Sequence, residues 1–486
     1  MGKPMKRCKR LVTVGAVVVI GSLLTAVPAG ATVIKPTVTG FASSTSTLFK
    51  TGGTITLSAT VANATSCVFT SNKTFTGMPY AATPCDGLVS HDVSLPVNAG
   101  KHPAKYTFKL SATGSGTTNA KPVVKVTVGT AAPPPARVTT VTTGANHTCA
   151  LLSDGTVWCG GWNMYGQLGD GGKSNSNEAM QVSGLSGATA VTAGGEHTCA
   201  LISDGTVRCW GFNGYGQLGN ASDTDTDIPV TVSSISGATA ISAGGTHTCA
   251  LLSDGTVKCW GWNLYGQLGD GINSNSNVPV AVTGVTGATA ISAGGGHTCA
   301  LLSGGTVQCW GNDASGQVGN GVTAYSSGAT TVSGIAGVTA IATGGTHSCA
   351  LLSGGTVKCW GFDAHGQLGN ASSTSSSIPL LVGGISGATG ISTGSDHTCA
   401  LVLNGAIRCW GWNYYGQLGN GTTDDTNVPV AVTGLTEAAT VSGGGYFSCA
   451  LMSLGTVNCW GEGNSSELGN GATANSSVPV VSFALP

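Results

Sequence analysis

Residues His247 to Trp260 read HTCALLSDGTVKCW, and this stretch decides the fold because it recurs along most of the chain. Related copies follow at a constant spacing of 50 residues and are centred on Cys149, Cys199, Cys249, Cys299, Cys349, Cys399 and Cys449. Seven units of 50 residues fill residues 137–486 without insertions. A fixed period of this length is typical of repeat architectures such as propellers.

Each unit contains four short segments with strand character and no helical periodicity. ATAISAGG ends at a glycine turn, HTCALLS and TVKCWG flank an Asp-Gly turn, and a segment such as VPVAVTG follows a polar loop. Four strands per repeat are typical of a propeller blade. High glycine (78 residues) and only 8% charged residues also indicate a turn-rich, all-β protein. We therefore predict a seven-bladed β-propeller over residues 137–486.

The two ends of the repeat region lead to an expectation about ring closure. The first unit has no VPV-type strand before it, whereas the last unit ends in such a strand, Val478–Phe483. We expect this C-terminal strand to pair with the blade formed by the N-terminal strands of the ring.

The run HTCALLSDGTVKCWGWNLYGQLGDG, which starts at His247, resembles the repeat of the regulator of chromosome condensation family. The shared pattern consists of Gly, His, Ala-Leu, Asp-Gly, Trp-Gly, Asn and Gly-Gln-Leu-Gly. The resemblance covers residues 137–486 and implies a seven-bladed propeller. It does not by itself imply a function, because one fold serves many functions.

Residues 1–31 have the pattern of a secretory signal peptide. Five basic residues precede the apolar run 11–27, and Ala29-Gly30-Ala31 predicts cleavage after Ala31. A retained membrane anchor is the alternative, although 17 apolar residues lie at the short limit for spanning a bilayer. After cleavage we expect no membrane span, and a secreted protein that is extracellular or associated with the cell envelope.

Residues 32–129 alternate apolar and polar side chains as the strands of a β-sandwich do. Tyr106, Phe108 and Leu110 are expected to face inward. This segment resembles a bacterial immunoglobulin-like domain, although it lacks the Trp between cysteines of antibody-type domains. Residues 130–136 are rich in proline and are predicted to form a stiff linker.

The cysteines are predicted to form disulfides, because removal of Cys8 with the signal leaves an even number in an exported protein. Each unit carries two cysteines ten residues apart across the Asp-Gly turn. A three-residue turn with Gly255 in the left-handed conformation places Cys249 opposite Cys259, whereas a two-residue turn does not. The predicted pairs are Cys149–Cys159, Cys199–Cys209, Cys249–Cys259, Cys299–Cys309, Cys349–Cys359, Cys399–Cys409, Cys449–Cys459 and Cys67–Cys85.

Two places in the sequence carry residues that could bind a metal ion. His247, Cys249 and Cys259 supply three plausible zinc ligands, but a fourth is missing and Phe447 replaces the histidine in the last unit. The run SDTDTD (222–227) has the alternating acids of a calcium loop, but neither the glycine nor the final glutamate follows. We therefore expect a solvated acidic loop there, and no metal or cofactor in the protein.

The sequence contains no known catalytic motif, neither Gly-x-Ser-x-Gly nor His-Glu-x-x-His. Residues that recur in nearly every unit are better explained by the architecture of the blade than by a unique site. Structural roles are therefore predicted for the repeated tryptophans and for the histidines His147, His197, His247, His297, His347 and His397. The sequence does not decide whether carboxylates from different blades meet across the ring to form a catalytic pair.

Function is expected where the copies differ. Because strand directions alternate, the turn before each histidine and the loop after each Trp-Gly lie at one end of the ring. Aromatic rings on exposed loops are typical of binding surfaces, and their alternative role is to cover neighbouring blades. The candidate binding face consists of Glu196, Asp396, Tyr446, Trp162, Tyr165, Phe212, Tyr215, Trp262, Tyr265, Phe362, His365, Trp412, Tyr414 and Tyr415.

Charge divides the chain and excludes some functions. Residues 32–129 hold 8 basic and 2 acidic residues, whereas residues 137–486 hold 6 basic and 18 acidic residues. A ring with a net charge of −12 is a poor match to nucleic acid. The family resemblance implies that guanine-nucleotide exchange depends on a wedge inserted between blade strands. Exchange is not expected here, because the repeats are uninterrupted and the protein is predicted to be exported.

The sequence as a whole predicts an exported, non-enzymatic binding protein with a protein or cell-envelope partner. One alternative is an inhibitor of an extracellular enzyme, similar to the bacterial β-lactamase inhibitory propellers. A second alternative, from a different class, is an enzyme that cleaves envelope glycans with its site in the central opening of the ring.

Overall fold

The computed structural model of the chain describes residues 17–18, 37–43, 53–62, 66–71, 80–82, 87–95, 104–113, 123–128 and 136–483. The chain divides into two units, Met1–Pro135 and Ala136–Pro486, which are treated separately below. The predicted cleavage site after Ala31 and nearly all of the predicted linker lie outside the described residues. In the part that is described, no helix is long and apolar enough to cross a membrane.

The first unit contains two antiparallel sheets. One has the order β1 (Val17–Val18), β8 (Val123–Val128), β7 (Ala104–Thr113), β4 (Ser66–Ser71) and β5 (Tyr80–Ala82), and the other has the order β2 (Thr37–Ser43), β3 (Gly53–Ala62) and β6 (Gly87–Leu95). Phe108 and Leu110 are buried as predicted. Cys67 is disulfide-bonded, and its predicted partner Cys85 lies outside the described residues. The immunoglobulin-like assignment stays a prediction.

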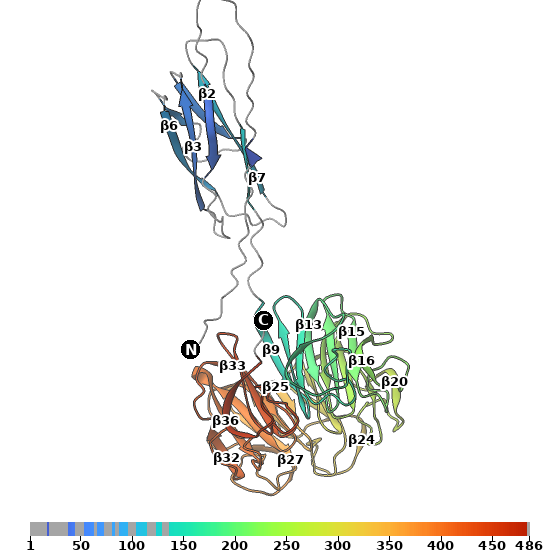
Figure 1. The fold of residues 1–486 in the computed structure, drawn as a ribbon. Coiled ribbons are helices and arrows are strands. Elements are labelled where there is room, and N and C mark those ends of the chain that lie inside the picture. Colours follow the sequence, from blue (N-terminus) through green and yellow to red (C-terminus); the bar gives the residue numbers. More distant parts are fainter. Residues whose placement is uncertain are drawn as a thin grey trace, which may run out of the picture. The chain divides into compact units, whose positions relative to one another are not determined.

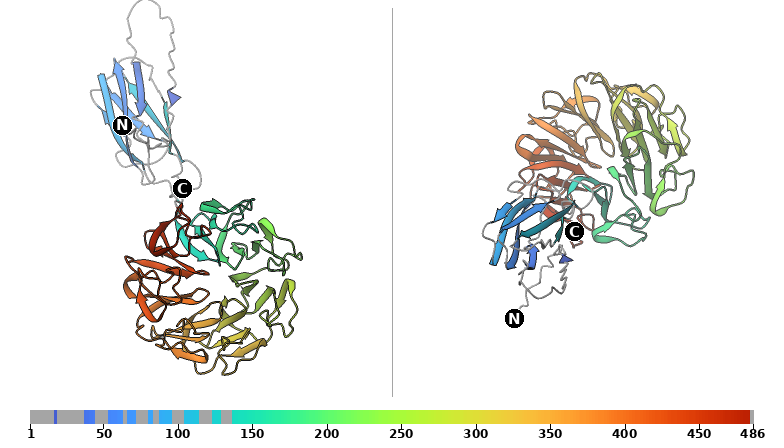
Figure 2. Two further views of the ribbon diagram at one scale, coloured as in Figure 1. Left: turned by 60° about the horizontal axis from the view of Figure 1, so that its bottom comes forward. Right: turned by 90° about the horizontal axis from the view of Figure 1, so that it is seen from above.

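The second unit is a ring of seven four-stranded antiparallel sheets, which confirms the predicted seven-bladed propeller (Figures 1 and 2). The inner strands are β9 (Val138–Thr143), β13 (Ala188–Ala193), β17 (Ala238–Ala243), β21 (Ala288–Ala293), β25 (Val338–Thr343), β29 (Ala388–Thr393) and β33 (Ala438–Gly443). The second strands are β10 (His147–Leu152), β14 (His197–Ile202), β18 (His247–Leu252), β22 (His297–Leu302), β26 (His347–Leu352), β30 (His397–Val402) and β34 (Phe447–Met452).

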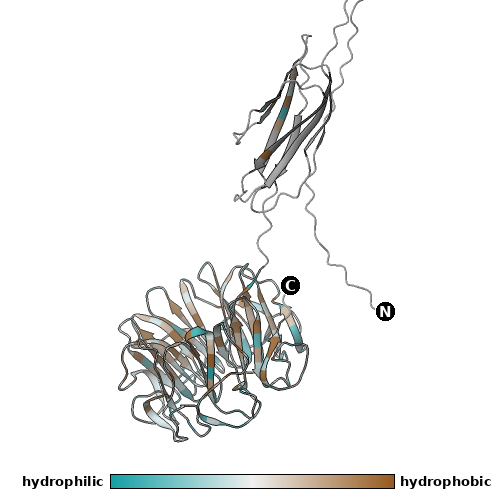
Figure 3. Cartoon of the chain, turned by 90° about the vertical axis from the view of Figure 1, so that its left-hand side faces the viewer, coloured by the Kyte–Doolittle hydropathy of each residue, from teal (hydrophilic) through white to brown (hydrophobic). Residues whose placement is uncertain are grey.

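The outer half of each blade follows the same order. The third strands are β11 (Val157–Gly161), β15 (Val207–Gly211), β19 (Val257–Gly261), β23 (Val307–Gly311), β27 (Val357–Gly361), β31 (Ala406–Gly411) and β35 (Val457–Gly461). The outer strands are β12 (Ser176–Gln181), β16 (Thr226–Thr231), β20 (Ser276–Ala281), β24 (Ser326–Thr331), β28 (Ser376–Leu381), β32 (Thr426–Ala431) and β36 (Ser476–Ser482). Hydrophobic residues, brown in Figure 3, lie along the strands of the ring.

The turn between the second and third strands determines the disulfides. In blade 3 the Leu252 N–H donates to the Thr256 carbonyl (2.9 Å) and Gly255 has φ +79°, so the turn has three residues as predicted. Cys249 therefore lies opposite Cys259. All seven pairs predicted in the ring form disulfides, with Cα–Cα distances of 4.0–4.1 Å. The zinc alternative fails because its two sulfur ligands are bonded to each other.

The expectation that the C-terminal strand would join the first blade is wrong. β36 pairs with β35 of its own blade, and the first blade takes its outer strand β12 from residues 176–181. The outer strand of each unit follows the third strand of the same unit through the polar loop, so each repeat is one complete blade. Blades 7 and 1, red and teal in Figure 2, close the ring by packing side by side without sharing a sheet.

A buried hydrogen-bond network joins each blade to the next at six of the seven interfaces. Between blades 3 and 4, His247 Nε2 lies 2.8 Å from Thr298 Oγ1, and Thr298 Oγ1 donates to the Gln267 carbonyl (3.0 Å). Trp310 Nε1 donates to the same carbonyl (2.9 Å). Because the single hydroxyl proton of Thr298 is used, His247 must be the donor at Nε2 and carry no proton at Nδ1. The predicted structural role of the histidines is confirmed.

The tryptophan of each network fills the space between two blades. Trp310 is fully buried, and a side chain at Gly269 would place its Cβ only 2.7 Å from Trp310 Nε1. The Gly-Gln-Leu-Gly run therefore needs its last glycine to receive the indole of the next blade. This confirms the predicted packing role of the repeated tryptophans.

The seventh interface, between blades 7 and 1, is built differently, and we call it the seam. Phe447 replaces the histidine, and Gly160 stands where the other blades carry tryptophan. The ring of Phe483 occupies this space, since a Cβ at Gly160 or at Gly469 would lie 2.9–3.0 Å from it. Phe483 reaches this position with φ +52°, a conformation that a bulky residue adopts only when packing compensates for it.

The outer strands leave one edge of each blade unpaired. Five of these strands carry a proline near their middle, namely Pro229, Pro279, Pro379, Pro429 and Pro479. The strands of blades 1 and 4 have Ala179 and Ala329 at that position.

The centre of the ring is a narrow opening of about 140 Å³. It is lined by the turns that follow the inner strands, such as Thr143–Ala145 and Ala243–Gly245. Glycine, alanine, threonine and serine make up this lining in the described ring, and no carboxyl or imidazole group borders it.

Candidate binding face

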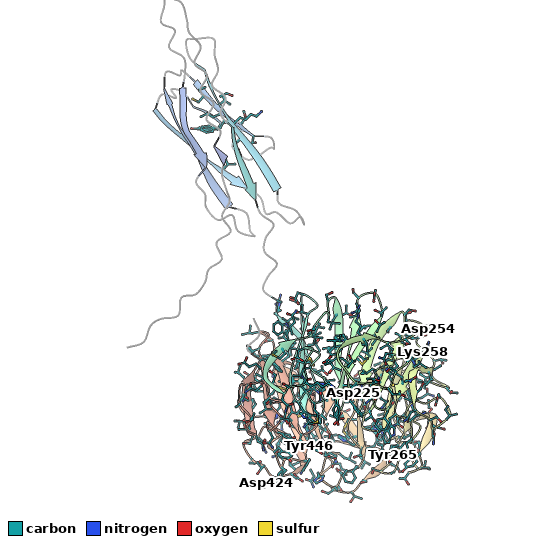
Figure 4. The ribbon with its side chains drawn as sticks, turned by 45° about the vertical axis from the view of Figure 1, so that its right-hand side comes forward. Asp225, Asp254, Lys258, Tyr265, Asp424 and Tyr446 are labelled. Carbon is teal, nitrogen blue, oxygen red and sulfur yellow. A yellow bond between two sulfur atoms is a disulfide. The ribbon has the colours of Figure 1, made fainter. Side chains whose placement is uncertain are left out.

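Two sets of loops meet at one end of the ring, which we call the loop end. In blade 1 the Trp162 N–H donates to the Asn146 carbonyl (2.9 Å), and this bond ties the loop after the third strand to the turn before the second strand. The same bond joins Trp412 to Asp396 in blade 6. The predicted placement of both variable sets at one end therefore holds in these blades. Figure 4 shows Tyr265, Tyr446 and Asp424 toward this end, and Asp254 and Lys258 at the other.

An asparagine fixes the shape of the long loop in blades 1, 2, 3 and 6. In blade 3, Asn263 Oδ1 accepts from the Leu268 N–H (2.9 Å), while its Nδ2 donates to three oxygens of the loop 270–274. Gln267 Oε1 also accepts from the Tyr265 N–H (3.0 Å). The aromatic residues that follow Trp-Gly are thus carried on ordered backbone.

The first run of aromatic rings crosses blades 1 to 4. Each ring contacts the next, with centroid separations between 4.8 and 6.0 Å, in the order Trp162, Tyr165, Phe212, Tyr215, Trp262, Tyr265 and Tyr325. Tyr215 is 40% exposed and Tyr325 is 54% exposed, and the other rings are half-buried. The rings therefore cover neighbouring blades and still present a continuous aromatic surface to solvent.

The second run covers blades 5 to 7 and centres on Trp412. Its indole lies 5.4 Å from His365, 5.9 Å from Tyr415 and 4.7 Å from Tyr446, measured between ring centroids. Phe362 contacts His365, and Tyr414 contacts both Trp412 and Tyr415. Tyr414 is 67% exposed.

Carboxylates border the second run. Asp425 Oδ2 lies 2.9 Å from His365 Nδ1, and Asp396 Oδ1 accepts from Gln367 Nε2 (3.3 Å). Burial raises the pKa of Asp396 despite the neighbouring His365, and burial also raises the pKa of Glu462. The pKa of Tyr446 is raised by burial and then by Asp396 and Glu462. Negative charge is thus concentrated around Trp412.

In the described ring, the loop end of blades 5 to 7 carries no Lys or Arg side chain. The Lys and Arg residues of these blades are Lys358 and Arg408, near the starts of their third strands beside the opposite turns. In blade 3, Asp254 has a lowered pKa because Thr256 donates to it, with a smaller contribution from Lys258. The two ends of the ring therefore differ in charge as well as in aromatic content.

Glu196 lies apart from this cluster, on blade 2. Burial raises its pKa, followed by the charge of Asp225. Asp225 Oδ1 accepts from the Asn213 N–H (2.8 Å), and Asp223 Oδ1 accepts from Asn277 Nδ2 (3.1 Å). Two acids of the SDTDTD run thus hold loops in place.

Sequence reasoning missed Tyr325, Asp425 and Glu462. Tyr325 lies in a polar loop outside the Trp-Gly pattern, and only the fold brings it to Tyr265. Glu462 occupies the position of Trp162 and Trp262, so a comparison of the repeats at that position would have identified it.

Comparison with known proteins agrees with the repeat pattern. The regulator of chromosome condensation (RCC1) repeat matches residues 138–167, 188–217, 238–267, 288–317, 338–367, 388–417 and 438–467. A second pattern of the same description matches residues 154–201, 204–251, 254–301, 354–401 and 404–451. An X-linked retinitis pigmentosa GTPase regulator homolog of Caenorhabditis elegans is 46% identical over 44 residues, which are 9% of this chain and 3% of that protein.

Solved propellers resemble the chain in fold. Prp20p from Saccharomyces cerevisiae matches with a TM-score of 0.60 and 20% identity over 71% of this chain and 87% of its own. Human WBSCR16 matches with a TM-score of 0.59 and 23% identity over 68% of this chain and 94% of its own. Since the repeat pattern is found in all seven blades and the ring has the matching fold, the chain belongs to the regulator of chromosome condensation (RCC1) repeat family.

Proposed function

We propose that this protein is an exported, non-enzymatic binding protein that uses the loop end of its propeller to bind a partner protein with exposed arginine side chains. The observation that carries the proposal is the cluster around Trp412. There His365, Tyr415 and Tyr446 surround the indole, and Asp396 and Glu462 lie beside it.

The chemistry of this cluster favours a cationic, planar group. Guanidinium stacks on aromatic faces and pairs with carboxylates, so arginine matches both components. His365 lies against Asp425, and no Lys or Arg of the described ring pairs with Asp396 or Glu462. Because the rings hold each other in place, little side-chain entropy is lost when a partner binds.

Other observations favour export and a role without catalysis. Seven disulfides are characteristic of an oxidising compartment. The central opening, which is the place expected for a glycan-cleaving site, is lined by small uncharged residues. A net charge of −12 on the ring disfavours nucleic acid. An inhibitor of an extracellular enzyme remains a special case of the same proposal.

The test is a pull-down with the immobilised mature chain from culture supernatant and from an envelope extract. We expect a protein partner that Trp412→Ala/Tyr446→Ala binds at least about tenfold more weakly, equal to ~1.4 kcal/mol, and that moderate salt releases. Lys258→Ala, at the opposite end of the ring, is the matched control and should bind like the wild type. Undiminished binding by the double variant, or turnover of glycan fragments, contradicts the proposal.

The captured partner also separates the two binding interpretations. If it is an extracellular enzyme whose activity falls when the propeller binds, the protein acts as an inhibitor. If its activity is unchanged, the propeller acts as an adhesive or scaffolding module.

A further inference from the structure

Two blades carry a carboxylate where other blades carry an amide. Asn163, Asn213, Asn263 and Asn413 anchor the long loops of blades 1, 2, 3 and 6, but blades 4 and 5 have Asp313 and Asp363 at this position. Blade 7 has Gly463 there. Since the amide nitrogen is a donor and a carboxylate oxygen is an acceptor, the exchange reverses the polarity of the contact.

The surroundings of the amide nitrogen consist of acceptors. Asn263 Nδ2 donates to Asp270 Oδ1 (3.2 Å), to the Ile272 carbonyl (3.0 Å) and to the Ser274 carbonyl (3.0 Å). Asn163 makes the corresponding three bonds in blade 1, at 3.1–3.2 Å. The loop therefore forms a cage of three oxygens around a nitrogen.

Blade 4 keeps the geometry that forms this cage. Asp313 Oδ1 accepts from the Val318 N–H (2.9 Å), just as Asn263 Oδ1 accepts from Leu268. Asn320 Oδ1 accepts from the Val322 N–H (3.0 Å), as Asp270 does from Ile272. By position in the repeat, the oxygens that correspond to the cage of blade 3 are those of Asn320, Val322 and Ala324, and Asp313 Oδ2 corresponds to the amide nitrogen.

Asp313 is left with a buried oxygen at the position where Asn263 has its amide nitrogen. Its side chain is 0% exposed, and Oδ2 has no hydrogen-bond partner in the described residues. If the side-chain amide of Asn320 were flipped, its NH2 group would replace Oδ1. The Val322 N–H, which now donates to Oδ1, would then face another donor. An unpaired buried carboxylate is costly, so a positive species is needed at this point.

Blade 5 has the same substitution, with the difference that the Thr374 N–H also acts on the carboxylate and lowers its pKa. Asp363 is 0% exposed, its Oδ1 accepts from the Leu368 N–H (2.9 Å), and its Oδ2 has no partner that meets hydrogen-bond geometry in the described ring. Asn370 Oδ1 accepts from the Ser372 N–H (3.2 Å) and so keeps the orientation of Asn320. Two neighbouring blades thus share the same unusual substitution.

We propose that the cages of Asp313 and Asp363 each bind a calcium ion. A carboxylate oxygen, an asparagine side-chain oxygen and two main-chain carbonyls are the ligand types that calcium prefers, and water completes the six to eight ligands it takes. The sites lie directly under the exposed loops that begin at Asn320 and Asn370, which gives the ion a short path from solvent. This inference does not depend on the proposed function.

A proton is the competing occupant. Burial raises the pKa of Asp313 to about 6 and the pKa of Asp363 to about 6. The two occupants differ in their dependence on calcium, which makes them separable by experiment.

The test is calorimetric titration of calcium into the chelator-stripped mature chain at pH 7.5. We expect two ions per wild-type chain, one in Asp313→Asn, one in Asp363→Asn and none in the double variant. Asparagine is the residue of blades 1, 2, 3 and 6, so these variants keep the loop anchored. As the reciprocal test, Asn263→Asp should add a third site.

Thermal melting of the same proteins provides a second readout. Calcium should raise the melting temperature of the wild type and leave that of the double variant unchanged. The proposal is overturned if the wild type binds no calcium at millimolar concentration, or if the double variant binds as much as the wild type. It is also overturned if the difference in melting temperature between the wild type and the double variant changes between pH 5 and 7 to the same extent with and without calcium, because then a proton occupies the cage.

Discussion

Six blade interfaces and the seam perform the same task with different residues. At the regular interfaces, His, Thr and Trp converge on a glutamine carbonyl, as His247, Thr298 and Trp310 do on Gln267. At the seam only Thr148 remains, donating to the Glu467 carbonyl (2.8 Å). The seam has lost both the imidazole and the indole, and yet the ring closes.

The seam shows which part of the interface is indispensable. Phe483 supplies an aromatic ring at the site of the missing tryptophan, from a residue 323 positions after Gly160. Among the described residues no donor takes the place of the imidazole, since Phe447 is fully buried and apolar. Volume between the blades must therefore be filled, whereas the polar network adds to stability without being required at every interface.

Acid should expose the largest difference between the two kinds of interface. Burial lowers the pKa of His247 to about 4 and that of His347 to about 3, and the other four network histidines behave alike. Below about pH 6.5 the unfolded chain binds protons that the folded chain does not, so stability is lost as the pH falls toward 4. We expect acid unfolding in this range, measured by tryptophan fluorescence.

The seam supplies the control for this prediction. His247→Phe introduces the residue that blade 7 has at this position. It should reduce the pH dependence of the free energy of unfolding by about one sixth, because one of six histidines is removed. A wild-type melting temperature that is the same at pH 7 and pH 5 contradicts the prediction.

The next largest effect should come from the aromatic fillers themselves. Trp310→Ala removes a fully buried indole and its hydrogen bond, and we expect a loss of about 4–5 kcal/mol in the free energy of unfolding. Phe483→Ala should cost less, about 3 kcal/mol, because Phe483 is 7% exposed and makes no side-chain hydrogen bond. Urea unfolding of both variants measures the difference. Equal losses in the free energy of unfolding would show that the aromatic ring contributes as much at the seam as at a regular interface.

A double-mutant cycle can convert the seam into a regular interface. Gly160→Trp alone should destabilise by about 1–3 kcal/mol, since its side chain meets Phe483. Combined with Phe483→Ala it should recover most of the loss, because the indole then occupies the space it has in the other blades. The interaction energy from the cycle is the measurement, and strict additivity would refute the idea that the two rings share one site.

The smallest effect concerns Glu467, which stands where six blades have glutamine. Burial raises the pKa of Glu467 to about 7, so folding favours the protonated acid and this contribution is lost as the pH rises through 7. Glu467→Gln should stabilise by about 1 kcal/mol at pH 8 and have almost no effect at pH 5. Melting temperatures at the two pH values test this, and an equal effect at both would exclude burial of the charge as the cause.

The repeat itself made much of the fold predictable. Seven aligned copies revealed the blade, the three-residue turn and the opposition of Cys249 and Cys259, since strand pairing is local and fixed by turn length. Ring closure was not predictable in this way, because β36 and β12 have similar patterns and only packing decides which sheet each joins. The role of Phe483 depends on a contact between distant residues.

The candidate face was predictable to a similar extent. Alternating strand direction correctly placed the variable loops at one end, but not the order in which their rings touch. Tyr325 joins the first run only through the path of its loop. Asp313 and Asp363 look like ordinary loop acids in the sequence, and their significance appears only when the oxygens around the equivalent asparagines are known.

The outer strands affect how separate molecules behave toward each other. A strand arriving from another copy could extend a blade, but a proline on the edge offers no N–H to it. Five outer strands are protected in this way, whereas blades 1 and 4 carry Ala179 and Ala329 instead. If concentrated protein forms sheet-paired aggregates, the growth should begin at these two blades, and a proline placed there should slow it.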